Sequence, residues 1–105
     1  MGAEVVRVMA DYQSFPLWRP GSDDYNVDPD SLPISAELVA ELNGWADDFD
    51  ATLNADDPAA SGFADAAAEG EFAERGMRLA RRLGEELGEG YSVEYFDVRT
   101  GSVHR

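Results

Sequence analysis

The sequence of 105 residues contains no cysteine, no lysine and a single histidine. Without cysteine there is no disulfide, no thiolate nucleophile and no cysteine-ligated zinc. Without lysine there is neither a Walker-A phosphate site nor a Schiff-base nucleophile. The one histidine, His104, stands beside the carboxyl terminus, where chain order is least expected, so a Ser–His–Asp relay is excluded as well. These absences remove the most familiar catalytic classes.

Long apolar runs are also missing. No stretch approaches the ~20 residues of a membrane helix, and no signal peptide is recognisable. We therefore expect a cytoplasmic protein that makes no membrane contact. The hydrophobic content of 44% is high enough for folding, and the length predicts a single domain, residues 1–105, with one modest core.

Negative charge is abundant and unevenly distributed. The chain has 22 acidic residues against 8 arginines, a net charge of −14. Residues 11–65 hold thirteen carboxylates and one arginine, a net of −12, whereas residues 66–105 hold eight carboxylates and six arginines, a net of −2. The electrostatic field of this negative charge repels phosphates, so we expect no direct binding of nucleic acid. It favours a basic protein as partner.

Two helices are predicted from the spacing of apolar residues. The first begins after the N-cap Ser35 and ends before Pro58. Its apolar side chains share one face and are Leu38, Leu42, Trp45, Phe49 and Leu53. The second helix covers residues 65–87 and ends at a glycine pair. Gly44 costs the first helix stability, so we expect it to mark the close packing of another element.

Strands are predicted at residues 4–10 and 91–98, where β-branched and aromatic residues gather. A proline-rich segment, residues 11–33, follows the first strand and is expected to be irregular. The predicted fold is α+β: a small antiparallel sheet of two or three strands packed against an antiparallel two-helix hairpin, with this long Pro-rich loop after the first strand. A third strand would come from residues 12–18 or 102–104, since two strands alone are marginal.

The acidic residues could form two kinds of site, a calcium-binding site or a catalytic acid–base pair. A partial calcium-loop pattern is made by Asp24, Asn26, Asp28 and Asp30. Pro29 stands where that loop needs glycine, and Ser35 where it needs glutamate, so a solvated acidic turn is favoured over a weak calcium site at residues 24–30. Glu94 and Asp97 have apolar neighbours, but on a strand they are expected to point outward. We therefore expect no enzyme, no cofactor and no metal.

Aromatic residues are concentrated in the irregular segment. We expect about half of its apolar side chains (Tyr12, Phe15, Leu17 and Trp18) to cover the core. Trp18 and Tyr25 have polar or proline neighbours and are expected to be presented outward as interface anchors. Aspartates of this segment and of the first helix would form one negative face. The predicted partner-binding residues are Trp18, Asp23, Asp24, Tyr25, Asp28, Asp30, Asp47 and Asp48.

Three stretches carry a resemblance: "ADYQSFPLW", "LPISAELVAELNGWADDFDATLNADDPAASGF" and "YSVEYFD". On these stretches the chain resembles a group of small acidic, uncharacterised actinobacterial proteins, and the resemblance brings no activity or catalytic residue with it. In general character the chain is similar to immunity proteins of bacterial toxin systems, which are small, acidic and non-catalytic.

These observations predict a non-catalytic protein that binds and blocks a basic partner protein, such as an immunity protein or antitoxin neutralising a bacterial toxin. The alternative is an acidic nucleic-acid mimic that regulates a DNA- or RNA-binding protein. A homodimer formed through apolar helix faces also remains open at the level of sequence.

Overall fold

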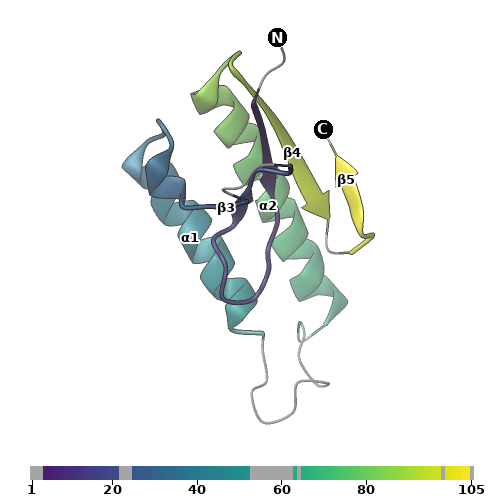
Figure 1. Ribbon diagram of the computed structural model, residues 1–105. Helices are drawn as coiled ribbons and strands as arrows, with labels where there is room; N and C mark the ends of the chain where they lie inside the picture. The colour runs from purple at the N-terminus through teal and green to yellow at the C-terminus, as the bar shows by residue number, and fades with distance from the viewer. Residues whose placement is uncertain (1–3, 22–24, 53–62, 64, 98, 105) are drawn as a thin grey trace.

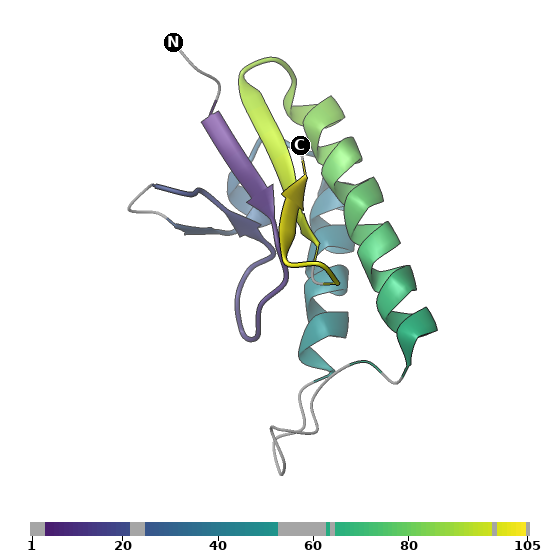
Figure 2. The same ribbon diagram turned by 90° about the vertical axis from the view of Figure 1, so that its right-hand side faces the viewer.

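The computed structural model describes residues 4–21, 25–52, 63, 65–97 and 99–104. Helices α1 (Ala36–Asp50) and α2 (Ala66–Leu87) lie against one face of a sheet (Figures 1 and 2). The sheet order is β3-β2-β1-β4-β5. The remaining elements are β1 (Glu4–Val8), β2 (Leu17–Trp18), β3 (Asn26–Val27), the 3₁₀ turn η1 (Pro29–Ser31), β4 (Tyr91–Asp97) and β5 (Ser102–His104). The predicted α+β class with two helices is confirmed.

The sheet differs from the prediction in the number and direction of its strands. Among the described residues it has five strands rather than two or three, because both candidates for a third strand pair with it and the unpredicted β3 pairs with β2. β2 pairs with β1 and β5 with β4, each in antiparallel fashion. β4, however, runs parallel to β1, with Val6 opposite Val93, so the prediction of a wholly antiparallel sheet is wrong.

The parallel pairing follows from the path of the chain between β3 and α1. The amide of Ser35, at the start of α1, donates to Glu86 near the end of α2 at 2.6 Å. The amide of Glu4 donates to the carbonyl of Gly90 at 3.1 Å, which places the start of β1 at the same end of the molecule. Residues 28–35 thus carry the chain back to the end where β1 begins. The helical hairpin leaves and returns to that end, so β4 runs in the direction of β1.

The proline-rich segment is not one irregular loop, because β2, β3 and η1 form within it. Each proline biases the preceding residue toward extended geometry, and short extended pieces can then pair as strands. The side chains of Pro16 and Pro29 are fully buried. Asp28 caps η1, where its carboxylate accepts the amide of Asp30 at 2.9 Å.

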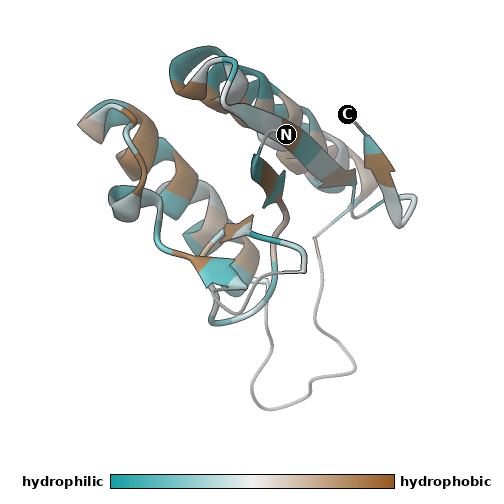
Figure 3. Ribbon diagram, turned by 45° about the horizontal axis from the view of Figure 1, so that its top comes forward, coloured by the Kyte–Doolittle hydropathy of each residue, from teal (hydrophilic) through white to brown (hydrophobic). Residues whose placement is uncertain are grey.

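The core lies between the sheet and the two helices. The N-cap role of Ser35 is confirmed, because its hydroxyl accepts the amide of Leu38 at 3.1 Å. Most of the predicted apolar face of α1 enters the core, while Leu53 lies outside the described residues. Hydrophobic and hydrophilic residues alternate along the helices in Figure 3. The core includes Val6, Val8, Leu17, Leu32, Leu38, Leu42, Trp45, Phe72, Leu79, Leu83 and Tyr95.

Close packing between elements occurs at Gly76 rather than at Gly44. A methyl group on Gly44 would meet only Arg75, at 3.8 Å. A methyl group on Gly76 would come within 2.6 Å of both the Trp45 and Tyr95 rings. Gly76 therefore lets α2 approach both α1 and β4. Neither described helix combines the length and apolar composition that a membrane span requires.

Candidate partner-binding site

Trp18 and Tyr25 form an aromatic pair, but only Tyr25 is exposed. Their ring centroids are 4.8 Å apart. Tyr25 is 44% exposed, whereas Trp18 is only 6% exposed. The Trp18 indole donates to the carbonyl of Met9 at 2.9 Å, which satisfies the polar atom that would otherwise oppose burial. The prediction that Trp18 points outward is therefore wrong, because it supports Tyr25 from within the fold.

The aspartates of the proline-rich segment are described only in part. Asp23 and Asp24 lie outside the described residues. Asp28 and Asp30 are exposed in and beside η1, which contacts α1. No cluster of three or more metal-binding side chains occurs among the residues with a described placement. The capping bond within η1 is the geometry of the solvated acidic turn.

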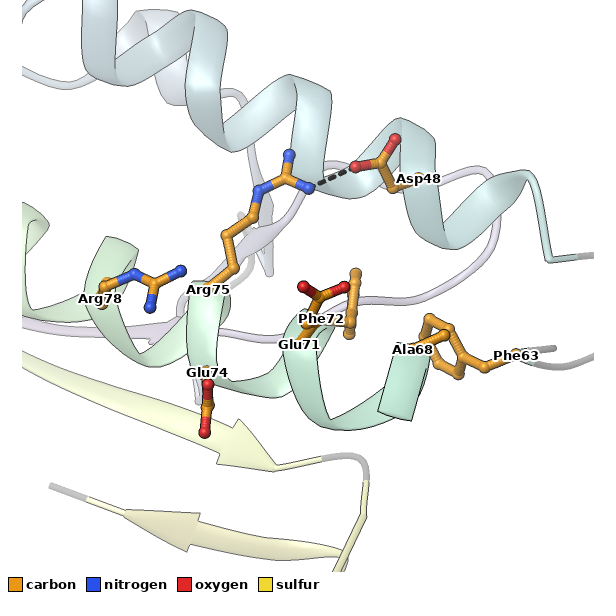
Figure 4. A pocket seen from close by; sticks show the side chains of 8 residues that line it. All are labelled: Asp48, Phe63, Ala68, Glu71, Phe72, Glu74, Arg75 and Arg78. Carbon is orange, nitrogen blue, oxygen red and sulfur yellow. Dashed lines mark hydrogen bonds and ion pairs between the residues drawn. The ribbon is translucent and has the colours of Figure 1, made fainter. Parts of the chain in front are cut away.

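The carboxylates of α1 that face α2 are paired with arginine. Arg75 reaches from α2 to Asp48 across a hollow of about 510 Å³, with Phe63 and Phe72 beside it (Figure 4). Nearer the start of α1, Arg82 contacts three carboxylates, at 3.4, 3.0 and 3.2 Å, which belong to Glu37, Glu41 and Glu86. The ion pairs of Asp48, Glu37 and Glu41 join the two helices. The two arginines reduce the negative charge of the four carboxylates on this face without cancelling it.

Glu86 has a second role at the start of α1. It accepts the amide and the hydroxyl of Ser35 at 2.6 and 3.0 Å. The bond from this amide is the main reason why the pKa of Glu86 is lowered, and Arg82 adds to it. The carboxylate is thus held ionised where the helix N-terminus favours negative charge.

Other carboxylates of α1 face the segment between β1 and β2. Asp47 and Asp50 lie with Asn43 along one side of a groove of about 350 Å³. Residues 13–16 and Asn26 form the other side. We call this hollow the acidic groove. In the part of the chain that the structure describes, neither aspartate has an arginine partner, so its negative charge is left uncompensated.

The loop that borders the acidic groove is held at several points. Asn26 accepts the amide of Phe15 at 3.0 Å and donates to its carbonyl at 2.8 Å. Asp50 accepts the amide of Gln13 at 2.9 Å, and Gln13 has a positive φ of 57°. Tyr12 stacks on Phe49, with centroids 4.6 Å apart, and its hydroxyl is 3.0 Å from that of Thr52. The irregular backbone is therefore fixed in place.

Phe15 emerges from this fixed loop with 43% of its surface exposed. Its backbone is bound by Asn26 on one side, and the next residue, Pro16, is fully buried. The backbone from which the ring projects is therefore held in place. An exposed aromatic residue and two uncompensated aspartates thus share the acidic groove.

The acids of β4 do not form an acid–base pair. Glu94 and Asp97 are buried, at 4% and 3% exposure, which contradicts the expectation that they point outward. Glu94 is bonded to Arg7 at 2.9 Å. Asp97 is bonded to Arg99 at 2.9 and 3.1 Å, and this bonding lowers its pKa despite burial. The Asp97 carboxylate, held ionised by Arg99, stabilises a strand end and its turn, whereas a general acid needs a raised pKa.

The family described as Serratia CdiI immunity protein-like matches residues 4–98, nearly the whole chain. The chain belongs to this family. Membership indicates a toxin-neutralising immunity protein that acts by binding, which confirms the predicted immunity-protein character. None of the curated proteins matches the chain.

For this immunity protein, sequence reasoning found the acidic aspartates but missed the residues that place them. Asp50 and Asn26 were not singled out for the site, and Phe15 was grouped with residues that could cover the core. A signal for Phe15 was available, since proline follows it and fixes it in extended geometry. The hydrogen bonds between Asn26 and Phe15 join positions 11 residues apart, so the sequence around either residue does not predict them.

Proposed function

We propose that this immunity protein neutralises its toxin by binding a basic surface of the toxin through the carboxylates of its amino-terminal half. The observation that carries the proposal is the division of these carboxylates into two sets. Those facing α2 are paired with arginine, whereas Asp28, Asp30 and Asp47 are exposed without an arginine partner in the described structure. Unpaired surface charge of one sign attracts a partner of the opposite sign and speeds its association.

The proposed contact surface includes one exposed aromatic residue from the sequence prediction. Tyr25 presents 44% of its surface and is supported by Trp18. Aromatic residues that rest on a fixed neighbour lose little freedom on binding and commonly serve as anchors. To Tyr25 we add, as proposed contact residues, the predicted aspartates Asp23, Asp24, Asp28, Asp30 and Asp47. Asp48 is left out of the proposed contact surface, because it is paired with Arg75.

Binding of the toxin tests the proposal directly. The probe is each candidate toxin domain that the genes next to the gene for this chain encode, produced together with this chain and then separated. We expect this chain to protect cells that express the toxin. We also expect the dissociation constant to rise steeply with salt concentration, because the Debye length falls to ~3 Å at 1 M ionic strength. Absence of both protection and association would refute neutralisation. Association that is indifferent to salt would refute the electrostatic part alone.

Competition by duplex DNA separates this function from nucleic-acid mimicry. A toxin-specific inhibitor uses contacts beyond charge, so DNA at equal phosphate concentration should displace it weakly. A mimic that occupies a DNA-binding channel should be displaced fully. The same salt series, repeated with DNA present, therefore distinguishes the two partner classes.

A further inference from the structure

The acidic groove combines an apolar contact with negative charge. Phe15 provides an exposed aromatic face on one wall, and Asp47 and Asp50 provide carboxylates on the other. The rest of the lining is uncharged. The hollow is therefore complementary to a group that is apolar along its length and positive at its end.

We propose that the acidic groove receives an arginine or lysine side chain of the toxin, with its methylene chain on Phe15 and its charge at Asp47. This inference rests on the proposed function and identifies the position at which the toxin is anchored. Long cationic side chains bury their stems against apolar surface while their heads remain with polar groups. An aromatic face adds attraction for the cation, most strongly for a guanidinium.

The two aspartates contribute differently. Asp50 already accepts the amide of Gln13, so it both fixes the loop and adds negative charge. The carboxylate of Asp47 is exposed and forms neither an ion pair nor a hydrogen bond with any described residue, so it is free to meet an incoming cation. Asp47 is therefore the proposed charge contact and Asp50 the positioning residue.

The fixed loop explains why this groove should matter more than other exposed carboxylates. Binding normally costs free energy for ordering loops and side chains at an interface. Here Asn26 and Asp50 hold the backbone of residues 13–15 before any partner arrives. Little of the interaction free energy is then lost to ordering, which is the property of an anchor position.

Two single substitutions test the proposal against the same toxin domain. Phe15→Ala and Asp47→Asn should each raise the dissociation constant by about tenfold or more, as anchor positions do. Their effects should be non-additive in the double variant, because one toxin side chain contacts both residues. Val103→Ala and Glu85→Gln are matched controls, since both are exposed and lie on other elements, and they should bind like the wild type.

The outcomes separate this proposal from the proposed function. If wild type binds the toxin and both groove variants bind equally well, the groove is not the anchor and the inference is wrong, while neutralisation stands. If both variants weaken binding but circular dichroism shows that they are unfolded, Phe15→Leu replaces Phe15→Ala. This variant keeps an apolar side chain without the aromatic face, and it should still bind the toxin more weakly than the wild type. Wild-type affinity for a folded Phe15→Leu variant together with Asp47→Asn would overturn the inference.

A short cationic probe tests the groove without the toxin. Titration with a tri-arginine peptide should shift the NMR amide signals of residues 13–15 and 43–50 more than those of α2, and Asp47→Asn should abolish the difference. Equal shifts at Glu85 and Asp47 would mean diffuse attraction and would contradict a defined site. A second copy of the chain in the groove would appear as a dimer in sedimentation that Phe15→Ala dissociates, and it would also overturn the proposal.

Discussion

Gly76→Ala should destabilise the protein, because Gly76 is the point where α2 approaches both α1 and β4. The added methyl carbon would lie 2.6 Å from Trp45 Cζ2 and 2.6 Å from Tyr95 Cε1. Favourable carbon contacts need about 3.5–4.0 Å, so one element must move by roughly 1 Å. Trp45 is fully buried and Tyr95 is 3% exposed, so both rings are packed within the core.

The expected loss follows from two opposing effects. Overpacking a core costs ~1–3 kcal/mol, while alanine in place of glycine within a helix returns about 0.5–1 kcal/mol. The free energy of unfolding should therefore fall by on the order of 1–2 kcal/mol. For a domain of this size, ~1 kcal/mol corresponds to about 4–8 °C in Tm, so Tm should fall by roughly 4–16 °C.

Thermal unfolding followed by circular dichroism measures this loss, and Gly70→Ala is the matched control. Gly70 lies in the same helix, and a methyl group there would meet nothing within 4 Å. Gly70→Ala should keep or raise Tm through the helix propensity of alanine alone. A Gly76→Ala protein as stable as Gly70→Ala would show that α2 does not pack on Trp45 and Tyr95 as described.

Two further predictions concern titration. Burial raises the pKa of Tyr95 to about 12, so stability should fall as pH rises from the ordinary tyrosine value toward 12, and Tyr95→Phe should remove the highest step of the phenolate absorbance titration. The buried hydroxyl has no hydrogen-bond partner among the described residues, so this variant should not lose stability at neutral pH. Bonding to Arg99 lowers the pKa of Asp97, so Arg99→Gln should lower the free energy of urea unfolding at neutral pH, and the difference from wild type should vanish as pH falls through that pKa.

The two helices could be predicted because their signals are local. Ser35 and Asp65 cap them through bonds that span three residues, and the apolar spacing of 3 and 4 residues marks the buried faces. Each feature lies within a few turns of the chain, so it can be read without knowledge of the partners.

The direction of β4 and the burial of Trp18 depend on contacts with residues far away in the sequence. The parallel pairing of β1 with β4 joins residues that are nearly the whole chain apart, and it depends on how residues 28–35 cross the molecule. Trp18 is buried because the Met9 carbonyl can accept its indole N–H, which neither neighbour of Trp18 in sequence could reveal. The close packing at Gly76 could not be predicted for the same reason, because the rings that contact it belong to α1 and β4.

The distribution of arginine decides which carboxylates remain for a partner. The helix α2 contains four arginines, and Arg75 and Arg82 reach across to the acids on the facing side of α1. The loop side of α1 has no such neighbour, since residues 11–18 contain no cation. Negative potential that arginine reduces on one side of a helix and not on the other directs a basic partner to the second side. The fold thus places unpaired carboxylates of the acidic half of the sequence on one side of α1, and the acidic groove lies on that side.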